Sequence, residues 1–290
     1  MLSFLSKQKV WVFDGAMGTM IQTLSSTKYK CPEELNLTNP NLIKHIHSLY
    51  IKEGSDLIQT NTFGANFLIL KSHGLENKTY EINKIAVQLA RDVAKDKIVV
   101  ASIGPTGRLI EPRGKITKEE VFNAYLLQAK GLDEADFINL ETVQSLEEAE
   151  IIITAIRSVL NLPISVTITF QKSNNGFFTK VEESIEDFVN WATKWNVDLI
   201  GTNCGEGFQQ SLEIISKMNK MLRLPLIAKP SAGLPIFIDD KIVYPETPDF
   251  IEPIVIKLFE NNVKILGGCC GTTPEHIKVI KRIANRINFS

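Results

Sequence analysis

The sequence predicts an α/β fold in which eight parallel strands, each followed by a helix, close into a barrel. Short β-branched segments recur eight times along the 290 residues, and amphipathic segments lie between them. The strand segments are nearly continuous apolar runs, which is typical of parallel strands covered on both faces. Eight strand–helix repeats in this length favour a closed TIM-type barrel over the main alternative, an open doubly wound sheet.

The expected strands end in polar or glycine-bearing turns. In chain order they are "VWVFDG" (10–15), "DLIQTN" (56–61), "IVVASIG" (98–104), "FINLET" (137–142), "ISVTITF" (164–170), "DLIGTNC" (198–204), "PLIAKPS" (225–231) and "VKILGGCC" (263–270).

Helical periodicity fills the intervals between these strands. In "PNLIKHIHSLYIKEG" the apolar residues share one stripe, and Gly54 can end the helix. "TKEEVFNAYLLQAKGLDEA" and "SIEDFVNWATKWN" follow the same pattern. Loops are expected at 171–181 and 231–248, among others. No repeat or linker-like stretch divides the chain, so we expect residues 1–290 to form a single barrel domain.

Composition narrows the function classes. The formal net charge of -1 gives no electrostatic reason to expect nucleic acid or an anionic membrane as a partner. No apolar run approaches the roughly 20 residues needed to cross a bilayer, and "MLSFLSKQKV" is too short in apolar residues for a secretory signal. We therefore expect a cytoplasmic protein, whose thiols stay reduced. Its four cysteines are then packing residues, metal ligands or nucleophiles.

Three of the four cysteines lie at predicted strand ends, where the chemistry of a β/α barrel is located. Cys204 ends the sixth strand, and Cys269 and Cys270 end the eighth between glycines that permit a tight turn. Such a turn lets neighbouring sulfurs converge, which a regular strand does not. Three thiolates suit Zn²⁺ and leave one tetrahedral position open. Spacing alone leaves two interpretations, a zinc site or buried cysteines without function. A disulfide between the paired cysteines is disfavoured in a reducing compartment.

A zinc site of this composition favours one kind of chemistry. A thiol entering the open position is deprotonated beside the cation, and three resident thiolates already outweigh the metal charge. The incoming sulfur therefore stays nucleophilic. This favours sulfur attack on an electrophilic carbon over zinc-hydroxide hydrolysis.

Acidic and amide side chains occupy other predicted strand ends. The Asp14 carboxylate in "FDGAMGT" can orient a ligand while the turn amides hold a carboxylate, or Asp14 can simply cap the turn. Glu141 closes an apolar strand, where an unpaired carboxylate is costly, so it needs a ligand ammonium or a neighbouring Lys or Arg. Asn61 and Thr62 are ligand-facing polar groups or turn formers.

The remaining candidates carry less weight. His45, His47 and His73 fall on or just after predicted surface helices and are expected to be solvated. His276, in the helix after the paired cysteines, is not expected to bind metal. Cys31 lies in a loop away from the strand ends and is interpreted as an ordinary cysteine.

The chain resembles the homocysteine S-methyltransferase family in motifs that follow in order over nearly its whole length. They are "DGAMGTM", "ELNLTNPNLIKHIHSLYIKEGSDLIQTNTFGAN", "GPTGRL", "NLETVQSLEEAE", "GTNCGEG" and "GGCCGTTPEHI". The likeness is closest to the homocysteine-binding module of cobalamin-dependent methionine synthase, and to the similar half of bifunctional proteins that also carry a methylenetetrahydrofolate reductase. The paired cysteines with the upstream "NCG" are its most specific part.

This resemblance implies a homocysteine-binding barrel over residues 1–290, with one Zn²⁺ per chain held by Cys204, Cys269 and Cys270. No other side chain is assigned a catalytic role. Relatives commonly read "PNAG" after the seventh strand, and in some of them that region closes the fourth zinc position when substrate is absent. This chain has "KPSAG", with Ser231 in place of the asparagine.

The same resemblance places the substrate. Homocysteine binds zinc through its sulfur, Glu141 faces its amino group, and the turn of Asp14, Gly15 and Ala16 lies near the amino acid end. Asn61 is included with the substrate-binding residues as a polar group at a strand end. The zinc-bound thiolate then attacks a methyl group in line and forms methionine, a neutral thioether that leaves.

The methyl donor is left open by these motifs. S-methylmethionine, S-adenosylmethionine, methyltetrahydrofolate and methylcobalamin on a partner protein all remain candidates. Two alternatives to a self-sufficient enzyme also remain. One is a substrate-binding subunit that methylates homocysteine only with a separate corrinoid or folate partner. The other is a methyltransferase for another small thiol or selenol.

Overall fold

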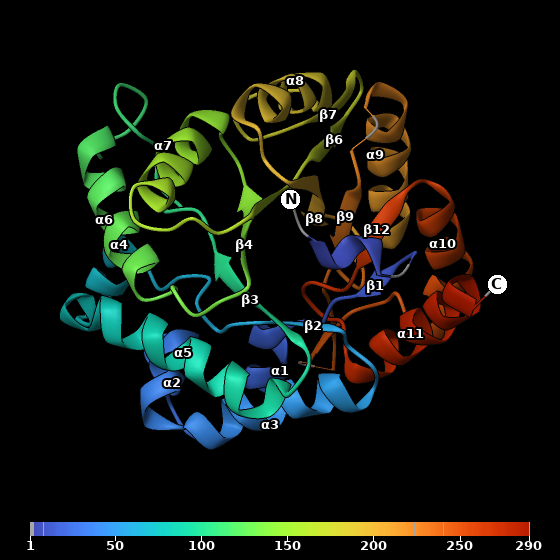
Figure 1. Ribbon diagram of the computed structural model, residues 1–290, viewed down its shortest axis with the longest axis horizontal. Helices are drawn as coiled ribbons and strands as arrows, with labels where there is room; N and C mark the ends of the chain where they lie inside the picture. The colour runs from blue at the N-terminus through green and yellow to red at the C-terminus, as the bar shows by residue number, and fades with distance from the viewer. Residues whose placement is uncertain (1–2, 8, 223, 240, 290) are drawn as a thin grey trace.

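Eight parallel strands surrounded by helices form the body of the computed structural model, which describes residues 3–7, 9–222, 224–239 and 241–289 (Figure 1). The sheet order is β1-β12-β9-β8-β5-β4-β3-β2. A parallel bridge between Phe13 and Leu57 joins its two outer strands and completes the ring. The predicted eight-stranded α/β barrel is confirmed. The barrel strands are β1 (Trp11–Val12), β2 (Leu57–Gln59), β3 (Ile98–Ile103), β4 (Phe137–Val143), β5 (Ile164–Ile168), β8 (Leu199–Cys204), β9 (Leu226–Pro230) and β12 (Val263–Leu266).

Helices form the outer layer of the barrel (Figure 1). Side-chain caps fix several of their first turns: Thr117 and Ser184 each form a capping box, at the starts of α6 and α8. Among the described residues, no helix combines the length and apolar character needed to span a bilayer. The α-helices are α1 (Met17–Leu24), α2 (Leu35–Thr38), α3 (Pro40–Lys52), α4 (Phe67–Lys71), α5 (Thr79–Ala94), α6 (Lys118–Lys130), α7 (Leu146–Arg157), α8 (Ile185–Trp195), α9 (Phe208–Met221), α10 (Pro248–Glu260) and α11 (Pro274–Phe289), with 3-10 turns η1 (Ser3–Ser6), η2 (Pro32–Glu34) and η3 (Glu76–Lys78).

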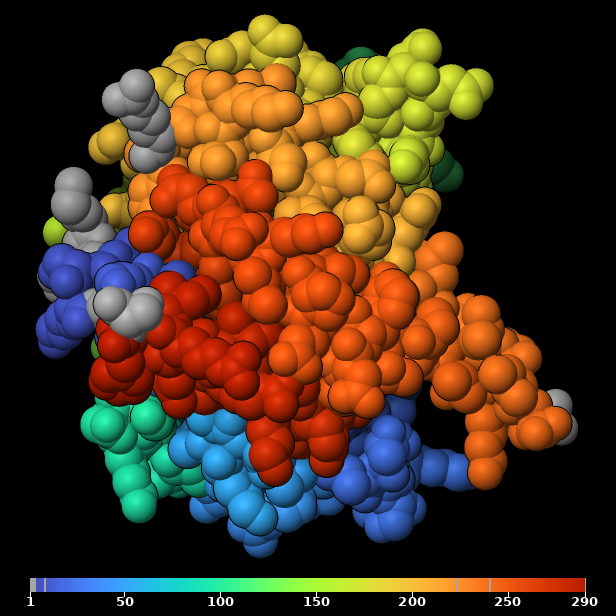
Figure 2. Space-filling view, turned by 90° about the vertical axis from the view of Figure 1, so that its right-hand side faces the viewer, coloured from blue at the N-terminus to red at the C-terminus, as the bar shows by residue number. Residues whose placement is uncertain are grey.

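Two antiparallel hairpins lie where the sequence predicts only loops. The first pairs β6 (Gln171–Ser173) with β7 (Gly176–Phe178), and the second pairs β10 (Ile236–Ile238) with β11 (Lys241–Val243). Their strands are three residues long, too short to produce a distinct sequence pattern. The orange segment that contains the second hairpin projects from the body of the molecule (Figure 2).

An apolar layer fills the lower half of the barrel interior, that is, the half toward the end where the strands begin. It is built from one inward residue on most of the strands: Phe13, Leu57, Val100, Phe137, Leu199, Ile227 and Ile265. The turn η1 covers its lower end, where the Phe4 ring packs edge-on against Trp11 at 4.9 Å between ring centroids. A larger cluster of apolar side chains, between the strands and the helices, forms the main core. The lower half of the barrel is therefore a packed floor.

Polar side chains occupy the upper half of the same interior. Successive inward positions along a strand are two residues apart, so the layer above Leu57, Val100 and Phe137 begins at 59, 102 and 139. Those positions hold Gln59, Ser102 and Asn139. Along β2, β3 and β4 the barrel interior thus changes from apolar to polar side chains within two residues, toward the end where the strands finish.

His47 differs from its prediction. Its side chain is fully buried on α3, and burial lowers its pKa to about 4. The prediction was wrong because α3 packs against α1, α2, α5 and α11, so its covered face is wider than the single apolar stripe in the sequence.

Candidate metal centre and substrate pocket

The three strand-end cysteines converge above the polar layer. Their sulfurs all lie within 4.8 Å of one another. The Sγ of Cys270 is 3.9 Å from that of Cys204 and 4.0 Å from that of Cys269. Four ligands placed tetrahedrally around zinc at about 2.3 Å are separated by about 3.8 Å. The cluster therefore has the spacing that a tetrahedral metal site requires.

Local backbone geometry brings these sulfurs together. Cys204 ends β8 with a left-handed φ of 60°, which turns its side chain toward β12. The amide of Cys269 donates to the carbonyl of Pro230 at 2.7 Å, and the carbonyl of Cys270 accepts from Ala232 at 2.9 Å. The connection after β9 therefore holds both cysteines of the pair. Gly271 follows with a φ of 79°.

The thiols share one negative charge when no cation neutralises them. Hydrogen bonds from Cys269 and Cys270 lower the pKa of the Cys204 thiol to about 2. The hydrogen bonds to Cys204, with its charge as a smaller cause, in turn raise the pKa of Cys270 to about 12 and that of Cys269 well above its usual value. Three sulfurs this close stay ionised together only beside a cation, which fits a soft divalent metal. The Ser231 hydroxyl also donates to the Cys204 sulfur at 3.6 Å.

A cavity of about 260 Å³ opens beneath the cysteines. Its size is close to the lower end of the roughly 300–1,000 Å³ typical of small-molecule pockets. All eight residues predicted as site residues line it: Asp14, Gly15, Ala16, Asn61, Glu141, Cys204, Cys269 and Cys270. The predicted positions therefore lie together around one cavity, and their roles in binding stay predictions.

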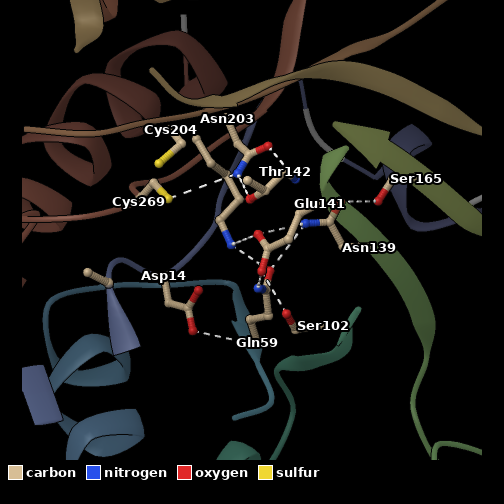
Figure 3. Close-up of polar contacts among 12 residues, drawn as sticks. Asp14, Gln59, Ser102, Asn139, Glu141, Thr142, Ser165, Asn203, Cys204 and Cys269 are labelled. Carbon is tan, nitrogen blue, oxygen red and sulfur yellow. Dashed lines mark hydrogen bonds and ion pairs between the residues drawn. The ribbon is translucent and has the colours of Figure 1, made fainter. Parts of the chain in front are cut away.

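Glu141 lies at the centre of a network of polar side chains in this cavity (Figure 3). Its Oε1 accepts from the Ser102 hydroxyl at 2.6 Å and from the Gln59 amide. Its Oε2 is 3.4 Å from the Asn139 amide nitrogen and 3.6 Å from the Lys229 ammonium. The sequence predicted a cation or a ligand for this carboxylate, and the chain itself supplies the cation.

Asp14 lies just before the first residues of helix α1. Its Oδ2 accepts from the backbone amide of Gln59 at 2.7 Å, and its Oδ1 is buried without a hydrogen-bond partner among the described residues. Burial raises the pKa of Asp14 to about 7, although the charge of Lys229 opposes the shift. Gly15 has no room for a side chain, since a Cβ would lie 2.8 Å from both Tyr50 and Thr272. The chain therefore turns tightly here, and the N-terminus of α1 lies at the cavity.

Asn61 lines the cavity, but its side-chain amide nitrogen is occupied by hydrogen bonds to other residues of the chain. It donates to the carbonyl of Pro32 at 2.8 Å and to the Asn36 side chain at 3.0 Å. This geometry fixes η2 and α2 against the strand end.

Sequence reasoning missed Gln59, Ser102, Asn139 and Lys229. Ser102 and Lys229 are single polar residues within apolar strands. Gln59 is the last residue of β2, and Asn139 shares β4 with the polar residues Glu141 and Thr142. The signal that could have found them is the two-residue spacing from an inward apolar position. The motifs carry no mark of which apolar residues point inward.

Comparison with known proteins agrees with this geometry. A family model described as "Homocysteine S-methyltransferase" matches residues 11–284. The chain belongs to the homocysteine S-methyltransferase family. This confirms the predicted family.

Curated relatives include the methionine synthases of Mycobacterium leprae (strain TN) and Mycobacterium tuberculosis (strain ATCC 25618 / H37Rv). Each is 30% identical, over 97% and 96% of this chain. The chain spans 25% of the length of each relative.

Solved structures share the fold. The metallated form of the homocysteine methyltransferase MmuM from Escherichia coli superposes with a TM-score of 0.80 at 20% identity, over 97% of this chain and 98% of that chain. A methyltransferase from Methanosarcina mazei gives a TM-score of 0.59 at 12% identity, over 98% and 97% of the two chains.

Proposed function

We propose that the protein is a zinc-dependent homocysteine S-methyltransferase that forms methionine. The observation that carries this proposal is the cluster of Cys204, Cys269 and Cys270, with sulfurs 3.9 and 4.0 Å apart at the top of a cavity lined by acidic groups. Family membership supports homocysteine as the acceptor and a methyl group as the cargo. Zinc is proposed because a three-thiolate donor set suits it and leaves one position for a substrate sulfur.

The chain's own residues would bind and orient the amino acid. α1 begins at Met17, and its N-cap residue Ala16 provides no side-chain cap, so the first amides of the helix are suited to a carboxylate. The buried Oδ1 of Asp14 offers an acceptor to the ammonium group. The three cysteines would hold Zn²⁺, which would supply a cation that keeps the substrate thiol ionised at neutral pH. A carbon–sulfur bond forms as the bond between the methyl group and its donor breaks.

Metal content and activity test the zinc site. We expect about one zinc per chain, from the single cluster of three thiolates, and loss of both zinc and methionine formation in Cys269→Ser. Cys31→Ser is the matched control, because Cys31 is buried away from the cluster and should keep both. Full activity in the Cys269→Ser protein would refute the proposal.

Parallel assays with different donors address the methyl source. The isolated chain is supplied with homocysteine and with S-methylmethionine, S-adenosylmethionine, methyltetrahydrofolate or methylcobalamin. Turnover with any free donor supports a self-sufficient enzyme. Zinc and homocysteine binding without turnover would instead favour a subunit that needs a corrinoid or folate protein. The length of the curated methionine synthases, of which this chain covers a quarter, keeps that second candidate in view.

Competition among thiols tests the acceptor. Homocysteine, selenohomocysteine and other small thiols compete for one limiting methyl donor. A preference for homocysteine over other thiols supports the proposal, whereas equal use of unrelated thiols would replace it with a broader thiol methyltransferase.

A further inference from the structure

Lys229 is a buried cation in the proposed substrate pocket. The family motifs quoted above assign it no role. Its side chain is 3% exposed, on the inward face of β9. The Nζ atom lies 3.6 Å from Glu141 Oε2 and donates to Gln59 Oε1 at 2.5 Å. It also lies 4.1 Å from the centroid of the Phe13 ring. A lysine is almost never buried this completely without such partners.

Glu141 is already satisfied by these neighbours. Its Oε1 receives hydrogen bonds from Ser102 and Gln59, and its Oε2 faces Asn139 and Lys229. An additional ammonium placed against Glu141 would also lie beside the Lys229 cation, and like charges at short range repel. The carboxylate and the lysine therefore form a closed pair.

Asp14 is the carboxylate of this cavity that forms no direct ion pair among the described residues, although the charge of Lys229 reaches it and opposes the rise in its pKa. Its Oδ1 is buried and has no hydrogen-bond partner among the described residues. Asp14, Glu141 and Lys229 all line the same cavity. The three charges sum to -1 when ionised, which one incoming ammonium neutralises. Without the lysine they would sum to -2, and the pocket would oppose a ligand that also carries a carboxylate.

We propose that Lys229 is the fixed counter-ion of Glu141 and a specificity-determining residue, which leaves Asp14 to receive the substrate ammonium and makes the pocket selective for a zwitterionic thiol. This rests on the proposed function, because homocysteine is such a thiol. Lys229 acts through Glu141 and Gln59, so it is a positioning residue that does not touch the reacting sulfur.

Three thiols separate the charge requirement from general damage to the site. Zinc-loaded protein is titrated calorimetrically with homocysteine, with 4-mercaptobutanoate, which lacks the ammonium, and with 3-mercaptopropylamine, which lacks the carboxylate. The variants are Lys229→Met and the double variant Glu141→Gln/Lys229→Met, which returns the charge sum to -1. Lys281→Met is the matched control, because Lys281 pairs with Asp56 at 2.7 Å outside the cavity.

The proposal predicts a change in ratio between ligands. In Lys229→Met the preference for homocysteine over 3-mercaptopropylamine should fall about tenfold or more, as expected for a charge left unpaired near the ligand. The double variant should recover the wild-type ratio to within about threefold, since pairs of charge changes at contacting residues compensate. Lys281→Met should leave the ratio unchanged.

Other outcomes would overturn it. Equal weakening of all three thiols in Lys229→Met would assign the lysine a purely structural role. Loss of amine binding in the double variant would show that Glu141 receives the ammonium. Should Lys229→Met not fold, Asp14→Asn decides: the proposal requires it to bind homocysteine no better than 4-mercaptobutanoate, and a retained preference refutes it. A wild-type protein that binds none of the thiols would reject the proposed function instead.

Discussion

Replacing Gln59 with leucine should destabilise the protein through its charged neighbours. The side chain donates to Glu141 and accepts from Lys229 at 2.5 Å. A hydrogen bond to a charged group contributes about 1.5–3 kcal/mol, so two of them set a range of about 3–6 kcal/mol. Lys229 and Glu141 stand 3.6 Å apart and can move closer, which recovers part of this loss. We expect the free energy of unfolding to fall by about 3 kcal/mol.

A double-mutant cycle measures this quantity. Metal-free protein, kept reduced with chelator present, is unfolded in urea at pH 7.5 and followed by far-UV circular dichroism. Gln59→Leu is made in the wild type and in the Glu141→Gln/Lys229→Met background. With neutral neighbours its cost should fall to about 1 kcal/mol, the value of an uncharged hydrogen bond. Equal costs in both backgrounds would refute the idea that Gln59 bridges two charges.

Two further predictions concern the glycine turn and the pH dependence of binding. Gly271→Ala should lower both stability and zinc content, because φ is 79° and a Cβ would lie 2.1 Å from the Tyr244 ring. Gly74→Ala is its control, with a φ of 69° and open space around the Cβ, and should cost only about 1 kcal/mol in unfolding experiments. The pKa of Asp14, raised to about 7 mainly by burial, predicts that the ammonium loses its anionic partner as the pH falls below 7. The ratio of homocysteine to 4-mercaptobutanoate affinity should therefore fall about tenfold per pH unit below 7 in calorimetry and stay flat in Asp14→Asn. A wild-type ratio that is flat from pH 8 to 5.5 would contradict it.

Strand positions and the metal cluster follow from the sequence because each has a local signature. Every predicted barrel strand overlaps an observed one. Cys204 ends β8 as expected, whereas β12 ends at Leu266 and the pair at 269–270 lies in the turn that follows it. Strand-end reasoning also identifies Asp14 and Glu141, because a carboxylate after an apolar run is conspicuous.

The partners of those carboxylates could not be predicted in the same way. Ser102 and Lys229 are single polar residues inside apolar runs, and Gln59 is followed directly by two more polar residues. Their roles depend on which strands are neighbours around the barrel. The prediction that His47 is solvated failed for a related reason, since its burial comes from helices distant in sequence. Local patterns specify elements, whereas the pairing of charges is a property of the closed ring.

The order of strands around the ring has a consequence for biosynthesis. The final strand β12 lies between β1 and β9, so the last part of the sheet to be synthesised docks beside the first. Two of the three sulfurs follow β12, and until it docks the chain offers a metal only Cys204 from this cluster. The proposed metal site is therefore complete only in chains in which β12 has docked, and cation uptake during refolding would report that event.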